Sequence, residues 1–327
     1  MMRAWQVHGH GEPAQVLRLV TVDQPEPGPG QLRLRVAAAG IGLPDVLMCR
    51  GSYPLTPGLP FTPGQEVTGT VTAVGAGVGL PIGSRVMAVT AFTEGHGGFA
   101  EECLAPADSA FPVPDGLDDV AAAGFWIPHL TGWLALVERG RLAPGEYLAV
   151  LGAAGGSGIA AVQLGRALGA RVVAVVSDEE RARFCRGLGA HASVVYRDGP
   201  LSAALRQATD GHGPDLVFDP VGGALASDAA AALARGGRLL SVGFASGAWP
   251  EITADRFVLG NTSLVGVFAG GYSRAELDDV HTRLTALVAD GSLRTAVGPA
   301  VDFDSLPQAL QRLADRSVIG KLVLGGI

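Results

Sequence analysis

The pattern of hydrophobic and polar positions divides the chain into regions of different character. In residues 1–120, apolar or alternating segments such as 31–41 (QLRLRVAAAGI) and 66–78 (EVTGTVTAVGAGV) are separated by turns. The turns are rich in Pro and Gly, as in 24–31 (QPEPGPGQ) and 56–65 (TPGLPFTPGQ). Short alternating runs bounded by such residues are typical of strands and tight turns. We therefore expect this first region to be mostly β-structure.

From residue 121 onward, short apolar runs alternate with stretches of helical spacing. The runs predict strands at 147–151, 170–177, 191–196, 214–222 and 236–244. Alternation of strands and helices indicates βαβ units, so residues 121–264 are expected to form a doubly wound parallel sheet in an α/β fold. The last region, 265–327, contains a helix-like pattern at 275–293 and ends in the strand-like segment 320–327.

Composition and charge narrow the class of protein. The chain has 327 residues, of which 48% are hydrophobic and 17% charged, enough for about two domains with buried cores. No apolar run approaches the roughly 18 residues of a membrane span, and a secretory signal is not evident. The net charge of −7 has no basic block, which argues against a nucleic-acid partner. Cys49, Cys103 and Cys185 are too few for a disulfide framework, so we expect a cytoplasmic location.

A segment almost without side chains lies between the strand at 147–151 and the helical stretch at 158–170. Its spacing A-x-G-x-x-G allows a tight turn, close approach of a ligand to the backbone, and close packing of helix on strand. The free N–H groups at a helix start also favour a pyrophosphate. Because a second strand follows, the pattern predicts a dinucleotide site rather than a structural turn alone. The predicted contacts are Ala153, Ala154, Gly155, Gly156, Ser157 and Gly158.

The end of the second strand bears on which dinucleotide is bound. An acidic residue there binds the ribose hydroxyls of NAD, but the expected position holds Ser177, with Arg181 one helical turn later. A hydroxyl and a guanidinium suit a 2′-phosphate, which favours NADPH. Asp178 is the complication, because a shift of one residue would place a carboxylate at the ribose. The alternative for this segment is a solvent-exposed helix start with Ser177 as its N-cap.

Motifs along nearly the whole chain match one family. They include 40–54 (GIGLPDVLMCRGSYP), 63–78, 97–108, 130–136, 150–172, 218–223, 236–247, 264–268 and 320–324. In these stretches the chain resembles the zinc-free quinone oxidoreductase (zeta-crystallin-like) family of the medium-chain dehydrogenase/reductase superfamily. The resemblance implies a GroES-like β-rich catalytic domain at 1–120 and 265–327, a Rossmann NADP-binding domain at 121–264, and a homodimer.

The sequence also indicates whether the residues of a zinc site are present. Zinc-dependent members of the superfamily carry a cysteine in the segment that matches 40–45 and a His-Glu pair in a later turn. Here Gln65 stands at the histidine position, Glu66 is retained, and the first segment lacks cysteine. Without a thiolate and an imidazole at these places, we expect no zinc site. His96 and His129 are alternative ligands, although a loop histidine and a cleft histidine are the simpler interpretations.

Two residues are candidates for protonating a substrate. Relatives carry an Asn that contacts substrate where this chain has Gly42, so that contact is lost here. Tyr53 matches a retained position, and a phenol can donate to a developing oxyanion. His129, where relatives often have Asn, is the second candidate. The alternative for Tyr53 is an anchor of its loop, and Asp45 is expected to be structural and to cap a helix over 45–50 (DVLMCR).

The resemblance also implies further cofactor contacts, each with a structural alternative. Thr131 matches a threonine near the nicotinamide, and Tyr196 a tyrosine near the adenosine phosphate. Lys321 matches a lysine near the cofactor, although a surface lysine is an equal alternative. The remaining contacts are predicted in the backbone at Gly243, Phe244, Ala245, Phe268 and Ala269. Asp219 is expected to organise its own turn.

The expected function is therefore NADPH-dependent, zinc-independent transfer of hydride to a small molecule, either a quinone or an α,β-unsaturated carbonyl. Such acceptors are already electrophilic, so hydrogen bonds and a proton can replace a Lewis acid. Two alternatives stay open. One is a protein that binds NADPH without catalysis, and the other is an enoyl or ketone reductase of a biosynthetic pathway.

Overall fold

The computed structural model describes residues 1–294 and 296–327. Contacts between residues divide the chain into two compact units. The first is Met1–Ile127 with Thr295–Ile327, and the second is Pro128–Arg294. Because the first unit takes both ends of the chain, the second is inserted into it. Each is described by itself below.

The first unit is built on a mostly antiparallel sheet, with a parallel pair of strands at one edge. Among the described residues its strand order is β14-β15-β3-β4-β5-β7, and β6 pairs with β3. The strands of this sheet are β3 (Gln31–Ile41), β4 (Glu66–Val74), β5 (Arg85–Val89), β6 (Glu102–Pro106), β7 (Ala110–Pro112), β14 (Val301–Asp302) and β15 (Leu322–Gly325). A separate ribbon pairs β1 (Met2–Val7) with β2 (Leu17–Val22). The helices are α1 (Pro13–Val16), α2 (Leu43–Cys49), α3 (Asp119–Ala123) and α11 (Leu306–Ala314), with short 3₁₀ turns at 92–94, 107–109 and 303–305.

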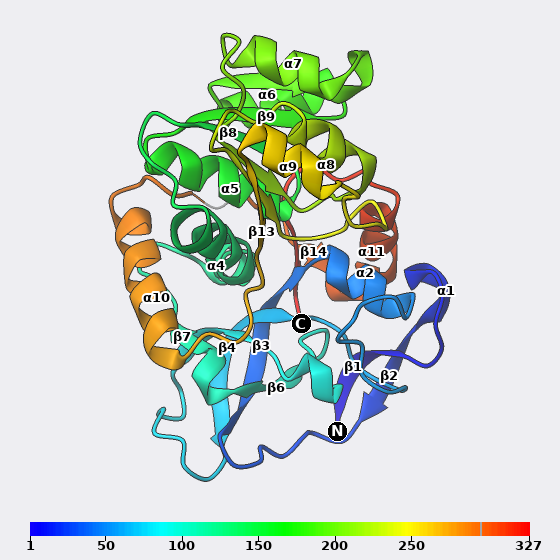
Figure 1. Cartoon of the computed structure of the whole chain (residues 1–327). Coiled ribbons are helices and arrows are strands. Elements are labelled where there is room, and N and C mark those ends of the chain that lie inside the picture. Colours follow the sequence, from blue (N-terminus) through cyan, green and yellow to red (C-terminus); the bar gives the residue numbers. More distant parts are fainter. Residues whose placement is uncertain (295) are drawn as a thin grey trace. The chain divides into compact units, whose positions relative to one another are not determined.

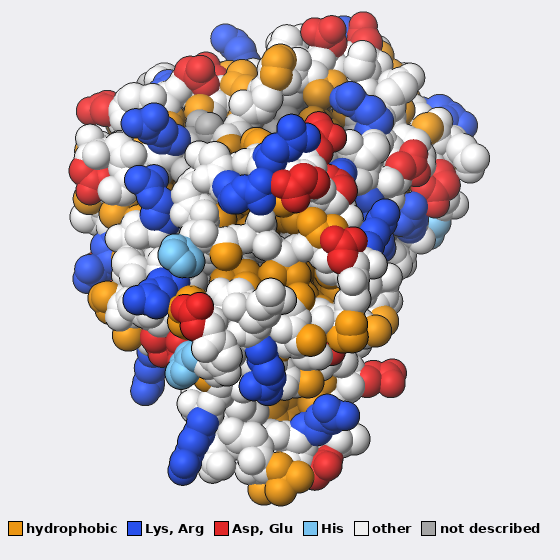
Figure 2. Space-filling view, turned by 90° about the horizontal axis from the view of Figure 1, so that it is seen from above, with side chains coloured by type: hydrophobic (Ala, Val, Ile, Leu, Met, Phe, Trp, Pro, Cys, Tyr) orange, Lys and Arg blue, Asp and Glu red, His pale blue; other side chains and the backbone are white. Residues whose placement is uncertain are grey.

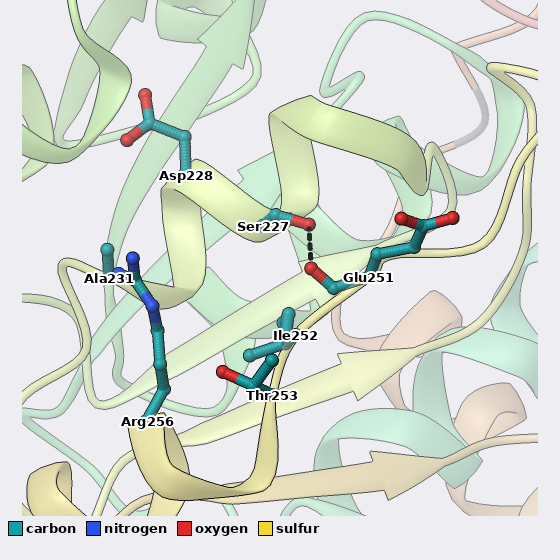
Figure 3. Close-up of a pocket in the computed structure, with 7 residues that line it drawn as sticks. All are labelled: Ser227, Asp228, Ala231, Glu251, Ile252, Thr253 and Arg256. Carbon is teal, nitrogen blue, oxygen red and sulfur yellow. Dashed lines mark hydrogen bonds between the residues drawn. The ribbon is translucent and has the colours of Figure 1, made fainter.

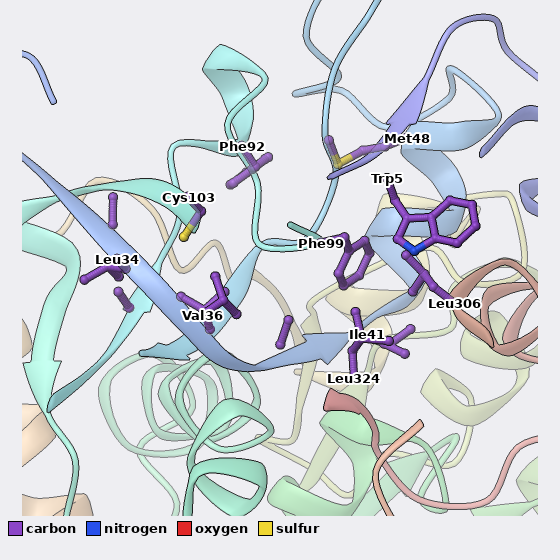
Figure 4. Packing of buried hydrophobic residues seen from close by; sticks show 14 of the residues in the cluster. Trp5, Leu34, Val36, Ile41, Met48, Phe92, Phe99, Cys103, Leu306 and Leu324 are labelled. Carbon is purple, nitrogen blue, oxygen red and sulfur yellow. The ribbon is translucent and has the colours of Figure 1, made fainter. Parts of the chain in front are cut away.

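The core of this unit joins the two ends of the chain. Alternate residues are buried in the first part of β3, as expected of a strand that covers a core with one face, and residues 38–41 at its end are all buried. Figure 4 shows Ile41 beside Leu324, with Trp5 and Leu306 nearby. The Trp5 indole donates to Phe303 O at 2.9 Å. β15 pairs antiparallel with β3, so the last strand of the chain completes the sheet of the first unit.

The second unit is the predicted parallel sheet, and it confirms the α/β fold class. Its described strands lie in the order β10-β9-β8-β11-β12-β13, and each pair is parallel. Figure 1 labels β8, β9 and β13 of this sheet. The strands are β8 (Tyr147–Leu151), β9 (Arg171–Val176), β10 (Ala192–Val195), β11 (Leu216–Asp219), β12 (Arg238–Ser241) and β13 (Ser263–Gly266). The two central strands, β8 and β11, are buried throughout, which explains their largely apolar sequences.

Helices connect the parallel strands. They are α5 (Gly156–Ala167), α6 (Glu179–Gly187), α7 (Leu201–Ala208), α8 (Gly223–Ala230) and α9 (Ala254–Gly260), with a 3₁₀ turn at 196–198. Another helix, α10 (Arg274–Ala289), follows β13. Small residues of α8, including Ala226 and Ala229, pack with Leu205 of α7 against one sheet face. The preceding α4 (Trp126–Trp133), which continues as a π-helix at 134–139, contains the division between the units.

The division between units differs from the predicted domain bounds. It falls after residues 127 and 294 rather than after 120 and 264. At the first division, Ala123 of α3 packs with Ala38 and Val323, so it stays with the antiparallel sheet. At the second, β13 pairs with β12, and the N–H of Arg294 donates to Gln163 Oε1 at 2.8 Å. These contacts keep residues 265–294 in the parallel-sheet unit.

Charged side chains are mixed over the face seen in Figure 2. Basic and acidic side chains lie next to one another there rather than in blocks of one sign. Ion pairs along helices include Arg274 with Asp278 at 2.9 Å and Arg283 with Asp279 at 2.8 Å. Among the described residues, no helix has both the length and the apolar character needed to cross a membrane.

Candidate functional site

The carboxyl edge of the parallel sheet brings most predicted cofactor residues together. In a parallel sheet all strands end at the same edge, and ligands bind there where the strand order reverses. Here the chain runs outward from β8 to β9 and β10 on one side, then returns to β11, β12 and β13 on the other. The reversal therefore lies beside the end of β8, where the glycine-rich turn begins.

The geometry of that turn explains its small residues. Gly152 adopts φ +60°, a conformation that side chains disfavour. A Cβ on Gly158 would lie 2.3 Å from Gly152 O and 2.7 Å from Ala153 Cα, so a larger residue cannot let α5 approach β8. Gly155 differs, since its nearest neighbour would be 3.4 Å away. At Gly155 the absence of a side chain leaves open space beside the turn rather than relieving a clash.

The start of α5 presents unpaired backbone donors, as the sequence predicted. Its N-cap, Gly155, has no side chain to cap the helix, and Ile159 N donates the first hydrogen bond to Gly155 O at 2.9 Å. The three N–H groups before it, at 156–158, precede the first helical bond and point out of the helix. An anion bound there would receive these bonds and the favourable end of the helix dipole.

The end of β9 holds a compact polar cluster formed by Ser177, Asp178 and Arg181. Asp178 Oδ1 accepts from Arg181 N at 3.0 Å, which caps α6. Its Oδ2 accepts from Ser177 Oγ at 2.7 Å and from Arg181 Nη1 at 2.5 Å. These bonds, led by the one from Arg181 N, lower the pKa of Asp178 to about 2. The N-cap is thus Asp178 and not Ser177, which corrects the structural alternative given for this segment.

Tyr196 lies next to this cluster through sheet register. Val195 of β10 pairs with Val176 of β9, so Tyr196 and Ser177 each follow a paired residue at the end of neighbouring strands. The Tyr196 ring packs partly against the sheet core. Its predicted place near the adenosine end of a cofactor agrees with this position, and its contact with a ligand stays a prediction.

The other half of the edge is formed by the segments after β11, β12 and β13. Asp219 at the end of β11 is buried, and its Oδ1 accepts from Val221 N at 2.9 Å and Gly222 N at 2.7 Å. This confirms that Asp219 organises its own turn. Burial raises its pKa against these two bonds. The segment after β12 is tied to the same turn, because Gly243 N donates to Asp219 O at 3.2 Å and Ala245 N to Pro220 O at 3.1 Å.

The predicted contacts in these segments differ in exposure. Phe244 is partly buried, and its ring lies 4.8 Å from that of Trp249. The N–H of Val267, directly after β13, donates to Ser241 O at 2.9 Å. The chain after β13 therefore begins beside the end of β12. The next residue, Phe268, has 67% of its surface exposed. A ring this exposed at the carboxyl edge is available to cover a bound molecule.

Helix α4 carries Thr131 and His129. Gly132 of this helix approaches α5 so closely that a Cβ would lie 2.7 Å from Leu164 Cδ1. Thr131 is partly exposed next to it, whereas His129 is buried, with 3% of its surface exposed. The structure therefore places Thr131 on a helix packed on α5, and makes His129 a core histidine of the second unit.

Tyr53 belongs to the first unit, in the loop after α2. Its backbone O accepts from Thr56 N at 3.0 Å and from Thr56 Oγ1 at 2.7 Å, and its ring lies 6.5 Å from that of Phe92. Partial burial and the nearby Asp45 carboxylate raise the pKa of Tyr53, and a hydrogen bond with Gln65 opposes the rise. The tyrosine thus anchors its loop and keeps a protonated hydroxyl next to Gln65.

Lys321 forms a buried ion pair that motif reasoning missed. Its Nζ donates to Glu66 Oε1, and Glu66 Oε2 accepts from Ile127 N at 3.0 Å. The exposed fraction is 8% for the Lys321 side chain and 4% for that of Glu66. The predicted role of Lys321 at the cofactor stays a prediction. A lysine that is the only one in the sequence was the available signal of a special role.

Asp45 lies close to this pair and is itself buried. Its Oδ2 accepts from Gly42 N at 2.8 Å, and its Oδ1 accepts from Gly64 N at 3.0 Å. Asp45 is therefore structural, as predicted, but α2 begins at Leu43 rather than at Asp45, so Gly42 is the N-cap and Asp45 lies in the first turn. Burial raises its pKa to about 7, against these two bonds and the Lys321 charge. The carboxylate thus fixes the start of α2 to the turn that precedes Gln65.

The positions that hold zinc in other members of the superfamily have different partners here. Gln65 Nε2 contacts Met48 Sδ at 3.7 Å, and Glu66 is engaged by Lys321 and Ile127. Gly42 offers no ligand atom on a side chain. Within residues 1–294 and 296–327, no cluster of three or more His, Cys, Asp or Glu side chains is arranged to hold a metal ion.

A separate hollow of about 390 Å³ lies in the second unit (Figure 3). It is lined by α8 and the segment that leads into α9, and Ser227 Oγ donates across it to Glu251 O at 3.1 Å. None of its lining residues belongs to the predicted cofactor set. The candidate site is therefore the carboxyl edge of the sheet rather than this hollow.

Comparison with protein families agrees with this architecture. Residues 28–115 match the family model described as "Alcohol dehydrogenase GroES-like domain". Residues 156–286 match the model described as "Zinc-binding dehydrogenase". The first match lies in the antiparallel unit and the second in the parallel-sheet unit.

Individual proteins resemble the chain over most of its length. The quinone oxidoreductase-like protein 2 homolog of Nematostella vectensis is 32% identical over 87% of this chain and 79% of its own. A mycobacterial structure complexed with NADPH is 31% identical over 99% of both chains, with a TM-score of 0.91. The Escherichia coli quinone oxidoreductase complexed with NADPH is 27% identical over 98% of this chain and 99% of its own, with a TM-score of 0.90. With its two units and these relatives, the chain belongs to the zinc-free quinone oxidoreductase-like family of the medium-chain dehydrogenase/reductase superfamily.

Proposed function

We propose that this chain is an NADPH-dependent reductase that transfers hydride to a quinone or an α,β-unsaturated carbonyl compound. The observation that carries the proposal is the side-chain-poor turn at the end of β8, with three outward N–H groups at the start of α5. The turn lies at the strand-order reversal of the sheet, where such folds bind dinucleotides. The two relatives complexed with NADPH support the choice of cofactor.

The residues along the edge fit a dinucleotide. The backbone of 156–158 would hold the pyrophosphate, and the space beside Gly155 would let it approach. Ser177, Arg181 and Tyr196 would hold the adenosine end, because they lie together at the ends of β9 and β10. The segments at 243–245 and 267–269, with Thr131, would hold the other end. When bound, the reduced nicotinamide supplies the hydride.

The protein must then supply a hydrogen bond and a proton to the acceptor oxygen. Tyr53 is the first candidate, because a phenol can donate a hydrogen bond and a proton and is protonated at neutral pH. Partial burial raises its pKa further, so the hydroxyl stays a donor. A neutral donor suits an electrophilic acceptor, whose developing charge a hydrogen bond can stabilise without a metal ion. His129 is the second candidate, although its burial in α4 limits its contact with solvent.

The test is turnover of NADPH with a panel of quinones, enones and enoyl thioesters. We expect oxidation of NADPH with at least one class, and a loss of roughly tenfold or more in kcat for Tyr53→Phe, as is typical when a general acid is removed. Tyr147→Phe is the control, because this second tyrosine hydroxyl bonds Asp210 at 2.9 Å at the start of β8. Tight NADPH binding without turnover of any acceptor would instead identify a non-catalytic NADPH-binding protein.

We also propose that the chain pairs with a second copy through the outer strand of its parallel sheet. In the described residues β13 pairs only with β12, so its other edge is available. Helix α9, just before it, has no buried residue. Val258, Leu259 and Leu264 are exposed by 72%, 81% and 49%. Exposed apolar side chains beside a free strand edge favour self-association.

A further inference from the structure

The polar cluster at the end of β9 contains the determinants of both cofactors at once. In this fold, an acidic residue at the end of the second strand binds the adenosine ribose of NAD, and an arginine nearby accommodates the 2′-phosphate of NADP. This chain has Asp178 and Arg181 at that place, and the two side chains are bonded to each other at 2.5 Å. The carboxylate that would bind the ribose of NAD is therefore bonded to the guanidinium that would bind the 2′-phosphate of NADP.

The bonds of Asp178 use the donors that a phosphate needs. Its carboxylate takes the Ser177 hydroxyl at 2.7 Å as well as the Arg181 guanidinium. These side chains are only partly buried, with 38% of the Asp178 and 19% of the Arg181 side chain exposed, so a ligand can reach them. The lowered pKa of Asp178 means that the carboxylate is charged at neutral pH.

A 2′-phosphate would then compete with a fixed negative charge. It gains charge-assisted bonds from Arg181 and Ser177 only by displacing Asp178, and it is repelled by that carboxylate. NADH has no phosphate there, so its ribose hydroxyls can donate to Asp178 without displacing it.

We propose that Asp178 is a specificity-determining residue that restrains the preference for NADPH, so that the protein binds NADH as well. The proposal rests on the proposed function, because it assumes that a pyridine nucleotide binds along this edge. Ser177 and Arg181 by themselves predict a preference for NADPH, and the proposal adds that Asp178 weakens this preference.

The decisive variant is Asp178→Asn. Asparagine is as good an N-cap as aspartate, so α6 keeps its cap from the bond to Arg181 N while the charge is removed. We expect NADPH binding to tighten by about tenfold and NADH binding to weaken by a few-fold, since one repulsion and one acceptor are lost. Nucleotide fluorescence titration gives both dissociation constants on the intact chain.

Asp118→Asn is the matched control, because Asp118 caps α3 by accepting from Ala121 N at 2.7 Å in the first unit. It makes the same chemical change at a cap that is not part of the predicted cofactor set, so the ratio of the two dissociation constants should not move. Arg181→Ala should move the ratio toward NADH in the wild-type background.

The outcomes separate the two proposals. An unchanged ratio in Asp178→Asn, with both nucleotides bound, overturns the role of Asp178 and leaves the reductase proposal standing. Weaker NADPH binding in this variant, with an unchanged thermal midpoint, also overturns it. If neither nucleotide binds the wild-type chain, the proposed function fails and the specificity role fails with it.

Discussion

Single residues in the first unit carry charges that ordinary cores exclude. Asp45, Glu66 and Lys321 are all buried, with two carboxyl groups and one ammonium group among them. Burial of a charge costs several kcal/mol unless bonds compensate for it. The backbone N–H groups of Gly42, Gly64 and Ile127 provide such bonds. This cluster holds α2 and the turn before Gln65 in place around Tyr53.

Asp45 makes the stability of the chain depend on pH. Its pKa is about 7 in the folded protein and 3.8 in the reference state, so the folded state binds more protons between these values. The free energy of unfolding should therefore fall as pH rises from about 4 to 7, by on the order of 4 kcal/mol from this group. Urea unfolding at several pH values measures the slope.

Asp45→Asn is the comparison for that slope. The variant cannot titrate at this position, so its stability should change less between pH 4 and 7 than that of the wild type. Equal slopes in the two proteins would show that Asp45 does not bind a proton on folding.

Residue contacts mark the limit of what the sequence could predict. The bond from Gly42 N to the Asp45 carboxylate is local, since the two residues are three positions apart, and the structural role of Asp45 was predicted. The start of α2 was predicted at Asp45, whereas the helix begins at Leu43. Lys321 and Glu66 are 255 positions apart, so no pattern of spacing joins them. Likewise, the bond between Asp178 and Arg181 decides how both side chains are used, but the sequence left open which of them faces the ribose.

At the scale of elements, two glycines in the turn between β8 and α5, Gly155 and Gly158, have different roles. Gly158→Ala should destabilise the chain by about 1–3 kcal/mol, because its Cβ would lie 2.3 Å from Gly152 O. Gly155→Ala should fold normally, since its nearest contact is 3.4 Å, but it should weaken NADPH binding by filling the space beside the turn. Thermal unfolding and nucleotide titration of both variants test this contrast. Equal stability losses in the two variants would contradict it.

Most strands of the parallel sheet were predictable because they are buried on both faces. The apolar run 147–151 coincides with β8, and 170–177 brackets β9. β13 was not predicted as a strand, because none of its four residues is buried and its sequence lacks a continuous apolar pattern. Its place depends on pairing with β12, which is a tertiary interaction that local propensity does not report.

At the scale of the whole molecule, the fold class was easier to predict than the division of the chain into two units. The fold class and the family were evident from colinear motifs, but the division between the units was not. It depends on contacts such as Ala123 with Val323 and Arg294 with Gln163, which join segments far apart in sequence. Sequence composition predicts the type of structure in a region better than it predicts where the region ends. The end depends on which unit the residues on either side of it contact.

The proposed dimer belongs to this scale. Leu259→Glu should shift the chain toward monomer, because it places a charge in the apolar surface of α9 where a second copy would bind. Ile82→Glu is the control, since Ile82 is similarly exposed, by 66%, in the first unit. Light scattering after size exclusion measures the mass. A wild-type chain that is monomeric at all concentrations would contradict the proposal.

The single lysine has a practical consequence. Lys321 is the only lysine in the sequence, and it is enclosed against Glu66. Acylating reagents directed at ε-amines therefore have no surface target on the folded chain, and modification of that position must await opening of the antiparallel unit. Mass spectrometry of the peptide that contains Lys321 would follow its acylation over time. The acylation rate would then report how often this unit opens, without any engineered probe.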